Sequence, residues 1–330
     1  MRLFICGAGT TIGTLGLPGV AGFGRELVKI VPDWRSKLPT LAAVVDALEP
    51  AHRRTEHDWD LDAAWTHLDY LAKLHKALEV MHFPSSASHA LHAALVAVYG
   101  KLELERVRSA HDAGHPFSLS DELRRVTNGD VVVSFNWDVL VESLLLHHLR
   151  NTPSTRVVQA PHKVLEPCVE FAKPHGSFAW NRYDLGASDD NMGPKLGPIP
   201  TPAEVLWTEH EHEFRKKKEP LLLGAVPIKS ELIAEVDAPQ HAVVMAQWAT
   251  FLRGLTEADE ICVLGYSFPK EDAYGRFLMR EAIRRRTRPI KRVDLYEVAG
   301  RVPVVRDAIV EVLGVSPKAV ADRGSMTKCP

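Results

Sequence analysis

The sequence lacks the features of a protein stabilised by a bound metal, of a membrane-spanning protein and of a strongly charged protein. Its four cysteines stand far apart without any Cys-x-x-Cys pair, so we expect neither a zinc ribbon nor a disulfide framework. No apolar run approaches the roughly 20 residues of a membrane-spanning helix. The 40 basic and 42 acidic residues give a formal charge of -2, which does not favour a phosphate backbone as a partner. The sequence therefore predicts no bound metal and no membrane contact, and it gives no support for binding nucleic acid.

What the chain does contain is enough apolar sequence for a large core. Of its 330 residues, 45% are hydrophobic and 25% are charged, which is typical of a globular protein, here taken as one elaborated domain over residues 1–330. Met1 leads directly into an apolar run and a glycine loop rather than into a secretory leader. We therefore expect a cytoplasmic protein.

The apolar runs predict an α/β fold with a Rossmann-like parallel sheet. Three short runs are typical of buried parallel strands, and they are Leu3–Cys6, Val131–Phe135 and Ile261–Leu264. Arg292–Val298 is a fourth candidate strand of more mixed composition. Between the first two, apolar residues recur at helical spacing, which predicts a large helical insertion over residues 31–127. Residues 181–220 are rich in Gly, Pro, Asp and Lys, and we expect a surface excursion there.

A glycine loop follows the first predicted strand. Gly7 and Gly9 allow the backbone to approach a pyrophosphate, Ala8 lies between them, and Thr10 and Thr11 supply hydroxyl donors. A plain tight turn would also explain the two glycines. An ordinary dinucleotide-binding unit has a second strand that ends in an acidic residue about 20 positions further on, and no such strand is predicted here. The loop alone therefore leaves both interpretations open.

Polar residues alternate with aromatic ones after the second predicted strand. Asn136 and Asp138 are spaced by two, so their side chains are expected to project toward the same space while Trp137 points elsewhere. Ser134, at the end of the strand, is a further candidate for contact with the ligand. Asp138 has an alternative role as the N-cap of the helix that follows. The pattern predicts a polar group facing a ligand at the end of the strand.

A single histidine stands out among the 16 of the chain because of its position. His175 follows an apolar run that ends at residue 172, and Gly176 and the hydroxyl of Ser177 come directly after it. A histidine at a strand end titrates near neutral pH and takes a proton from water or from a hydroxyl group. We predict that His175 is a general base.

The third and fourth predicted strands end in further candidate ligand groups. Gly265 permits close approach of a ligand, while Tyr266 and Ser267 place hydroxyl groups beside it. Asp272 is either another ligand group or the cap of the next helix. Glu297, at the end of the fourth strand, is expected to accept a hydrogen bond from a ribose hydroxyl.

Four of these motifs carry a resemblance to a known family. They are Gly7-Ala8-Gly9, Asn136-x-Asp138, His175-Gly176-Ser177 and Gly265-Tyr266-Ser267. In this order along almost the whole chain, they resemble the motifs of the sirtuin superfamily, above all those of its bacterial sirtuin-like branch associated with antiphage defence. The resemblance implies a sheet that binds NAD, with the Gly-Ala-Gly loop on the pyrophosphate. It also implies that Asn136 and Asp138 lie near the nicotinamide ribose and that His175 is the general base.

Departures from the family pattern narrow the expected reaction. Sirtuin deacylases share a four-cysteine zinc module that this chain cannot assemble, and they place Gln where this chain has Phe135. They also carry an acidic residue after a Gly-Ile-Pro step, where this chain has Gly-Leu-Pro-Gly at positions 16–19. These departures favour hydrolysis of NAD over protein deacylation.

The expected function is therefore cleavage of the nicotinamide–ribose bond of NAD, giving nicotinamide and ADP-ribose, in antiphage defence. NAD is the expected substrate, with no metal. Unregulated NAD hydrolysis would be toxic, so we also expect control by a homo-oligomer or a regulatory protein partner. Two alternatives remain: an NAD-dependent ADP-ribosyltransferase, and a module that senses NAD or ADP-ribose without catalysis.

Overall fold

The structure is a computed structural model. It describes residues 1–10, 22–55, 57–61, 63–67, 98, 122–138, 141, 145, 157–159, 168–181, 220–222, 238–270 and 272–324. Within these residues the main feature is a seven-stranded sheet in the order β11-β10-β9-β1-β4-β6-β5, in which every neighbouring pair is parallel. The predicted α/β class with a Rossmann-like parallel sheet is confirmed.

The strands of this sheet include all four that the sequence predicts. Their bounds are β1 Arg2–Cys6, β4 Val131–Ser134, β5 Val157–Gln159, β6 Val169–Ala172, β9 Glu260–Leu264, β10 Arg292–Tyr296 and β11 Val320–Asp322. The central strand β1 pairs with β4 on one side and with β9 on the other. From β1 the chain continues to β4, whereas from β9 it continues to β10 on the opposite side, so the strand order reverses at β1 and β9. In open α/β sheets, ligands bind at the carboxyl ends of the strands beside such a reversal.

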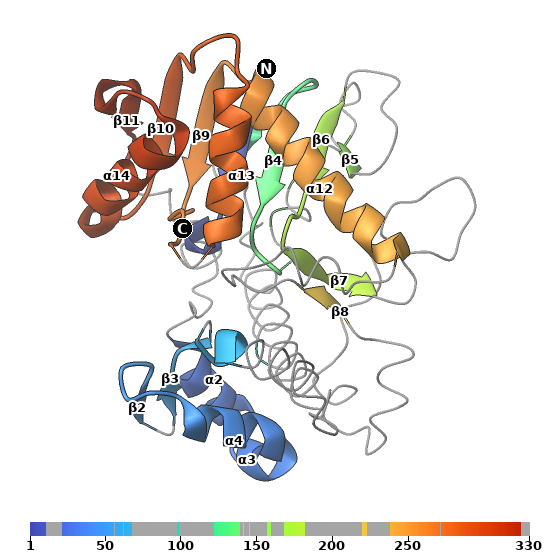
Figure 1. The fold of residues 1–330 in the computed structure, drawn as a ribbon, viewed down its shortest axis with the longest axis vertical. Coiled ribbons are helices and arrows are strands. Elements are labelled where there is room, and N and C mark those ends of the chain that lie inside the picture. Colours follow the sequence, from blue (N-terminus) through green and yellow to red (C-terminus); the bar gives the residue numbers. More distant parts are fainter. Residues whose placement is uncertain are drawn as a thin grey trace, which may run out of the picture.

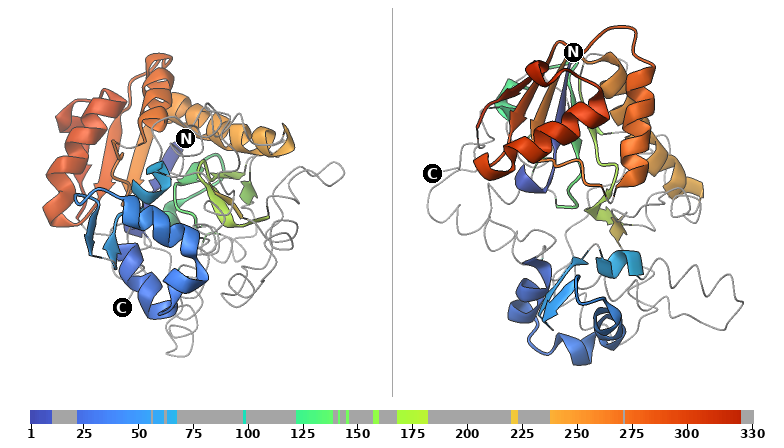
Figure 2. Two further views of the ribbon diagram at one scale, coloured as in Figure 1. Left: turned by 60° about the horizontal axis from the view of Figure 1, so that its bottom comes forward. Right: turned by 60° about the vertical axis from the view of Figure 1, so that its left-hand side comes forward.

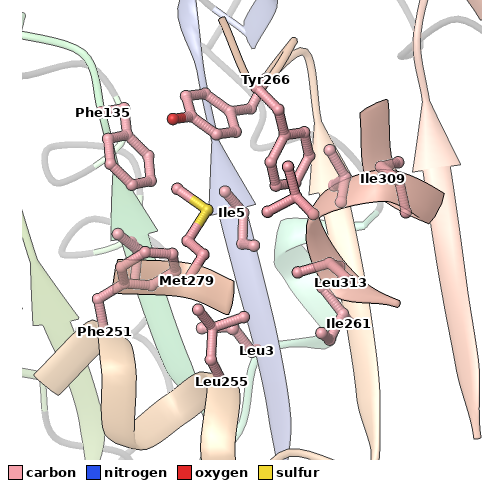
Figure 3. Close-up of a cluster of buried hydrophobic side chains, with 14 of the residues drawn as sticks. Leu3, Ile5, Phe135, Phe251, Leu255, Ile261, Tyr266, Met279, Ile309 and Leu313 are labelled. Carbon is pink, nitrogen blue, oxygen red and sulfur yellow. The ribbon is translucent and has the colours of Figure 1, made fainter. Parts of the chain in front are cut away.

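Three long helices cover one face of the sheet (Figure 1). They are α12 Ala238–Glu257, α13 Ala273–Arg284 and α14 Val302–Leu313. Alternate side chains of each strand meet these helices, as Leu3 and Ile5 of β1 do in the main core, part of which is drawn in Figure 3. Phe4 and Cys6 point to the other face and join a second buried cluster. Burial on both faces explains why the central strands β1 and β4 appear as continuous apolar runs. None of the helices in the described part of the chain combines the length and apolarity that crossing a membrane requires.

A small lobe lies beyond the carboxyl ends of the central strands (Figures 1 and 2). Its elements are α2 Phe23–Ile30, α3 Trp34–Lys37, α4 Pro39–Ala47, β2 Arg53–Thr55 and β3 Asp58–Trp59. Trp59 is buried between Phe23 and Trp34, at ring distances of 5.6 and 6.1 Å. The β2–β3 hairpin was not predicted, since strands of three and two residues are too short to show a period. Residues 68–97 and 99–121 lie outside the described residues, so the helical insertion at 31–127 stays a prediction.

A short antiparallel ribbon continues the segment that holds the predicted histidine. Strand β7 Gly176–Asn181 pairs with β8 Pro220–Leu222, and Asn181 is the register partner of Pro220. The ribbon therefore brings together the two ends of the surface excursion expected at 181–220. Residues 182–219 themselves lie outside the described residues. The remaining described elements are the 3-10 helices η3 Leu123–Arg125, η4 Ala299–Arg301 and η5 Pro317–Ala319.

Candidate functional site

The loops after β9, β1, β4 and β6 leave the same edge of the sheet. These four strands are neighbours in this order, and all run parallel. The carboxyl ends of parallel strands meet at one edge, so residues far apart in the sequence come together there. The glycine loop, Asn136 and His175 all lie on these loops. The fold thus gathers the candidate residues at the reversal in strand order.

The glycine loop is packed directly onto the loop after β9. The amide groups of Gly7 and Gly9 donate to the carbonyl oxygens of Leu264 and Gly265, both at 2.9 Å, and the Thr10 hydroxyl donates to Leu264 at 2.7 Å. A Cβ atom on Gly9 would lie 2.7 Å from the Cα of Gly265, and one on Gly7 would also meet backbone atoms at similar distances. The glycines are therefore required by contact between two loops of the protein itself.

The same contacts limit what the loop offers to a ligand. The amides of Gly7 and Gly9 and the hydroxyl of Thr10 already donate within the fold, whereas Ala8 is exposed. Thr11 lies outside the described residues. The role predicted for this loop on a pyrophosphate therefore stays a prediction, and its exposed side at Ala8 is the part that a ligand can approach.

Asn136 ties the loop after β4 to the glycine loop. Its Nδ2 donates to the carbonyl of Gly7 at 2.9 Å, and its own amide donates to the hydroxyl of Ser134 at 3.3 Å. Asn136 is 7% exposed and Ser134 is fully buried. The side chain of Asn136 therefore has a structural task as well as the predicted one beside the ribose.

The loop after β6 holds the backbone around Asp138. The Lys173 ammonium donates to the carbonyl oxygen of Asp138, and the Ser177 hydroxyl donates to that of Trp137 at 3.4 Å. Lys173 is fully buried, and its amide donates to Oε1 of Gln247 on α12 at 2.9 Å. Sequence analysis gave Lys173 no role, although it stands two residues before His175. The sequence analysis therefore did not foresee a buried lysine side chain beside the predicted site.

His175 forms a buried pair with Asp272. Its Nε2 lies 3.1 Å from Oδ2 of Asp272, and the two residues are 97 positions apart in the sequence. His175 is 5% exposed and Asp272 is fully buried. The other oxygen of Asp272 accepts from the amide of Gly275 at 3.0 Å and so caps α13, as the sequence allowed. The pairing with His175 is the contact at this site that sequence analysis missed.

Aromatic rings pack around His175. The rings of Phe135 and His175 meet edge to face with their centroids 4.9 Å apart, and the centroid of Trp248 lies 6.3 Å from that of His175. Phe135 also stacks on Tyr266 at 4.3 Å, and the two rings are drawn side by side in Figure 3. Because Phe135 directly precedes Asn136 in the chain, it links the two predicted catalytic residues. Apolar rings around a polar pair lower the local dielectric, which strengthens its electrostatic contacts.

Two buried polar atoms at this edge have no hydrogen-bond partner among the described residues. They are the Tyr266 hydroxyl and Oε2 of Glu297, on residues that are 4% and 5% exposed. Burial raises the pKa of the Tyr266 phenol well above its ordinary value, so the hydroxyl remains a donor. Oε1 of Glu297 accepts from the amide of Val298 at 2.9 Å. Buried polar atoms usually have partners, so a donor and an acceptor here fit a polar ligand.

The other predicted residues lie nearby with less to distinguish them. Gly176 and Gly265 have positive φ angles of 82° and 58°, which side chains rarely adopt. Ser267 is partly buried. Trp65 of the small lobe stacks on Trp137 at 5.4 Å, so this lobe touches the segment between Asn136 and Asp138.

A separate surface cavity lies away from these residues. It is a shallow hollow on the sheet face opposite α12, α13 and α14. Its lining carries Arg2, Arg125 and Arg292 together with Glu122, Glu260 and Asp294. These charges balance, so the cavity indicates no charged ligand.

Within the described ranges, no group of three or more His, Cys, Asp or Glu side chains is placed to hold a metal ion. The functional argument therefore starts from side-chain geometry at the carboxyl edge. Comparison with known proteins adds nothing to it, because no family model and no curated protein matches the chain.

Proposed function

We propose that this protein is an NAD hydrolase that cleaves the nicotinamide–ribose bond of NAD. The observation that carries the proposal is the buried His175–Asp272 pair, linked through Phe135 to Asn136 at the point where the strand order reverses. A histidine held by a carboxylate is a common form of general base. A carboxyl edge beside such a reversal is where α/β sheets bind nucleotides.

The reaction needs little beyond position, water and a base. The bond between C1′ of the ribose and the pyridinium nitrogen breaks, and its electron pair leaves with neutral nicotinamide. No general acid is required, and the ribose passes through an oxocarbenium-like state, as in glycoside hydrolysis. Water then adds to C1′ and loses one proton to His175, so NAD and water give ADP-ribose, nicotinamide and a proton.

Each site residue has a defined task in this proposal. His175 accepts the proton, Asn136 orients the water or the ribose, and Asp138 holds the nicotinamide end. The unpartnered oxygen of Glu297 accepts from a ribose hydroxyl, and the Tyr266 hydroxyl donates to an oxygen of the ligand. Both tasks would satisfy buried atoms that otherwise lack partners among the described residues, which supports a polar ligand at this edge.

The biological setting follows from the family resemblance. A cytoplasmic enzyme that depletes NAD suits an antiphage effector, which would have to remain silent until infection. A homo-oligomer or a regulatory partner would supply this control. The contact between Trp65 and Trp137 gives the small lobe a direct route to the segment that holds Asn136 and Asp138.

The decisive experiment is incubation of the purified full-length protein with NAD, followed by chromatography of the products. We expect nicotinamide and ADP-ribose in equal amounts. Labelling of the protein or of a nucleic acid by ADP-ribose would identify a transferase instead. Binding of NAD without any cleavage would identify a sensing module.

The absence of metal chemistry is tested separately. We expect EDTA to leave the rate of NAD cleavage and the melting temperature unchanged, because the proposed mechanism uses no metal ion. Elemental analysis of the purified protein serves as the control. Loss of activity together with a stoichiometric metal ion would contradict the proposal.

A further inference from the structure

The two oxygens of the Asp272 carboxylate make different contacts. Oδ1 accepts from the amide of Gly275 and caps α13, while Oδ2 lies 3.1 Å from Nε2 of His175. A helix cap needs only one oxygen. The second oxygen is aimed instead at a ring on the loop after β6, and both groups are buried.

This pairing fixes which ring nitrogen of His175 carries the proton. An ionised carboxylate is only an acceptor, so the nitrogen that faces it must donate. Neutral histidine carries one ring proton, and when Nε2 holds it, Nδ1 is the nitrogen able to take another. We propose that Asp272 is a positioning residue that holds His175 in the Nε2–H tautomer and so makes Nδ1 the basic atom. The inference rests on the proposed function for its catalytic consequence, but not for the tautomer itself.

The segment around Asp272 is built to keep the carboxylate in place. A Cβ atom on Gly275 would lie 2.6 Å from Oδ2 and 2.7 Å from Oδ1, so the first turn of α13 packs closely on both oxygens. Phe268, four residues before Asp272, has a positive φ of 51°, and Arg276 donates to its carbonyl at 2.8 Å. Bulky residues adopt such angles where the surroundings impose them, often at functional sites. The carboxylate is therefore fixed from its own loop and from the helix that follows.

The variant Asp272→Asn separates the two tasks. Asparagine is as good a helix cap as aspartate, so its side-chain oxygen retains the bond to the Gly275 amide. Its NH₂ group then faces Nε2, which must become an acceptor, and the ring proton moves to Nδ1. The control is Asp60→Asn, because Oδ1 of Asp60 accepts from the Ala63 amide at 3.1 Å in the small lobe, where the same exchange leaves His175 untouched.

Nitrogen chemical shifts of ¹⁵N-histidine-labelled protein report the tautomer directly, with His175→Gln used to assign the signals. We expect Nε2–H in the parent and in Asp60→Asn, and Nδ1–H in Asp272→Asn. We also expect kcat for NAD cleavage to fall on the order of 10²–10⁴-fold in Asp272→Asn, the range for loss of a positioned base, with KM nearly unchanged. A purely structural role would change neither the tautomer nor the ratio of kcat to KM.

Each outcome decides the inference. An unchanged tautomer in Asp272→Asn overturns it, and so does a changed tautomer with an unchanged kcat. If the parent does not cleave NAD, the proposed function fails, and the nitrogen shifts alone decide whether Asp272 fixes the ring. If Asp272→Asn does not fold, Asp272→Ser replaces it, since serine caps a helix but lacks the second oxygen. Nε2 then has no carboxylate to donate to, and we expect the ring to lose its preference for the Nε2–H form; an unchanged preference overturns the inference.

Discussion

The loops after β1 and β6 leave the same edge of the sheet but are stabilised in different ways. After β1, backbone amides and glycines contact the loop after β9, and only Ala8 is exposed in the described part of this loop. After β6, the contacts come from buried polar side chains, with Lys173 on a carbonyl and His175 on a carboxylate. Close packing and backbone hydrogen bonds thus stabilise the loop after β1, whereas buried polar side chains stabilise the loop after β6.

This difference changes how the two motifs are interpreted. Close packing of two loops accounts for Gly7 and Gly9 without any ligand. Packing alone does not account for a histidine, a carboxylate and a lysine that are all buried, since burying charged or polar groups costs free energy unless they are paired. The loop after β6 is therefore the stronger sign of function, although the glycine loop is the more familiar motif.

The largest expected effect comes from changing a buried polar side chain in the loop after β6. His175→Gln should lower kcat for NAD cleavage on the order of 10²–10⁴-fold, because the general base is lost. Glutamine keeps an N–H that can donate to Asp272, so the fold should survive. Rates from product chromatography, with melting temperatures alongside, measure both effects. The control is His52→Gln, on an exposed histidine of the small lobe.

The inactive variant also tests binding without chemistry. NAD at about 100 times its Kd should stabilise His175→Gln by about 2.7 kcal/mol, which thermal unfolding would detect. Full activity in His175→Gln would contradict the assigned base. Inactivity without any stabilisation by NAD would contradict the nucleotide site.

A smaller effect is expected from disturbing the close packing of the loop after β1. Gly9→Ala places a methyl group 2.7 Å from the backbone of Gly265, and crowding of this kind typically costs about 1–3 kcal/mol of unfolding free energy. Chemical denaturation measures it. Gly300→Ala is the matched control because nothing lies within 4 Å of its added carbon, so a change within about 0.5 kcal/mol is expected. Equal stability of the two variants would mean that the loops are not packed as described.

The outcome for Gly9 also determines how ligand data are interpreted. If Gly9→Ala loses NAD binding together with stability, the loss does not show that NAD contacts the loop. Only a variant that keeps its stability can show this, and exposed Ala8 is the position to change.

Sequence patterns predicted the parts of the fold that depend on local periodicity. Strands β1 and β4 are buried on both faces and appear as apolar runs, and β9 and β10 keep enough buried apolar residues to be recognised. Strands β5 and β11 have three residues each and show no period. Helix α12 was not predicted, because polar Gln247 and Thr250 are buried among its apolar residues and blur the helical pattern. Long-range contacts decide what a short or mixed segment becomes.

In the candidate site, too, local features could be predicted and long-range contacts could not. The positions of His175 and Asn136 at strand ends could be predicted, because they follow apolar runs. The pairing of His175 with Asp272 across 97 residues could not, since only the fold brings β6 and α13 together. The sequence around Asp272 predicted its role as a helix cap. That local role explained the residue well enough that its pairing with the distant His175 was not considered.

The smallest expected effect comes from an ion pair that joins α14 to α13, the helix capped by Asp272. Glu311 of α14 lies 2.5 Å from Arg276 of α13, and the hydrogen bond from Arg276 holds the pKa of this carboxyl below its ordinary value. A lowered pKa in the folded state means that the stabilisation is present above the unfolded pKa and is lost as the pH falls through the folded one. Glu311→Gln should therefore lower the melting temperature slightly at about pH 7, because the half-exposed Glu311 carboxylate is screened by water, and the difference should shrink as the pH falls through the folded pKa. NAD cleavage should stay at the parental rate, because the other Arg276 nitrogen keeps its bond to Phe268.

Two results would contradict this prediction. A difference in melting temperature that persists in acid would mean that Glu311 acts through packing rather than charge. A fall in the rate of cleavage would mean that the Glu311–Arg276 pair helps to position Asp272 beside His175.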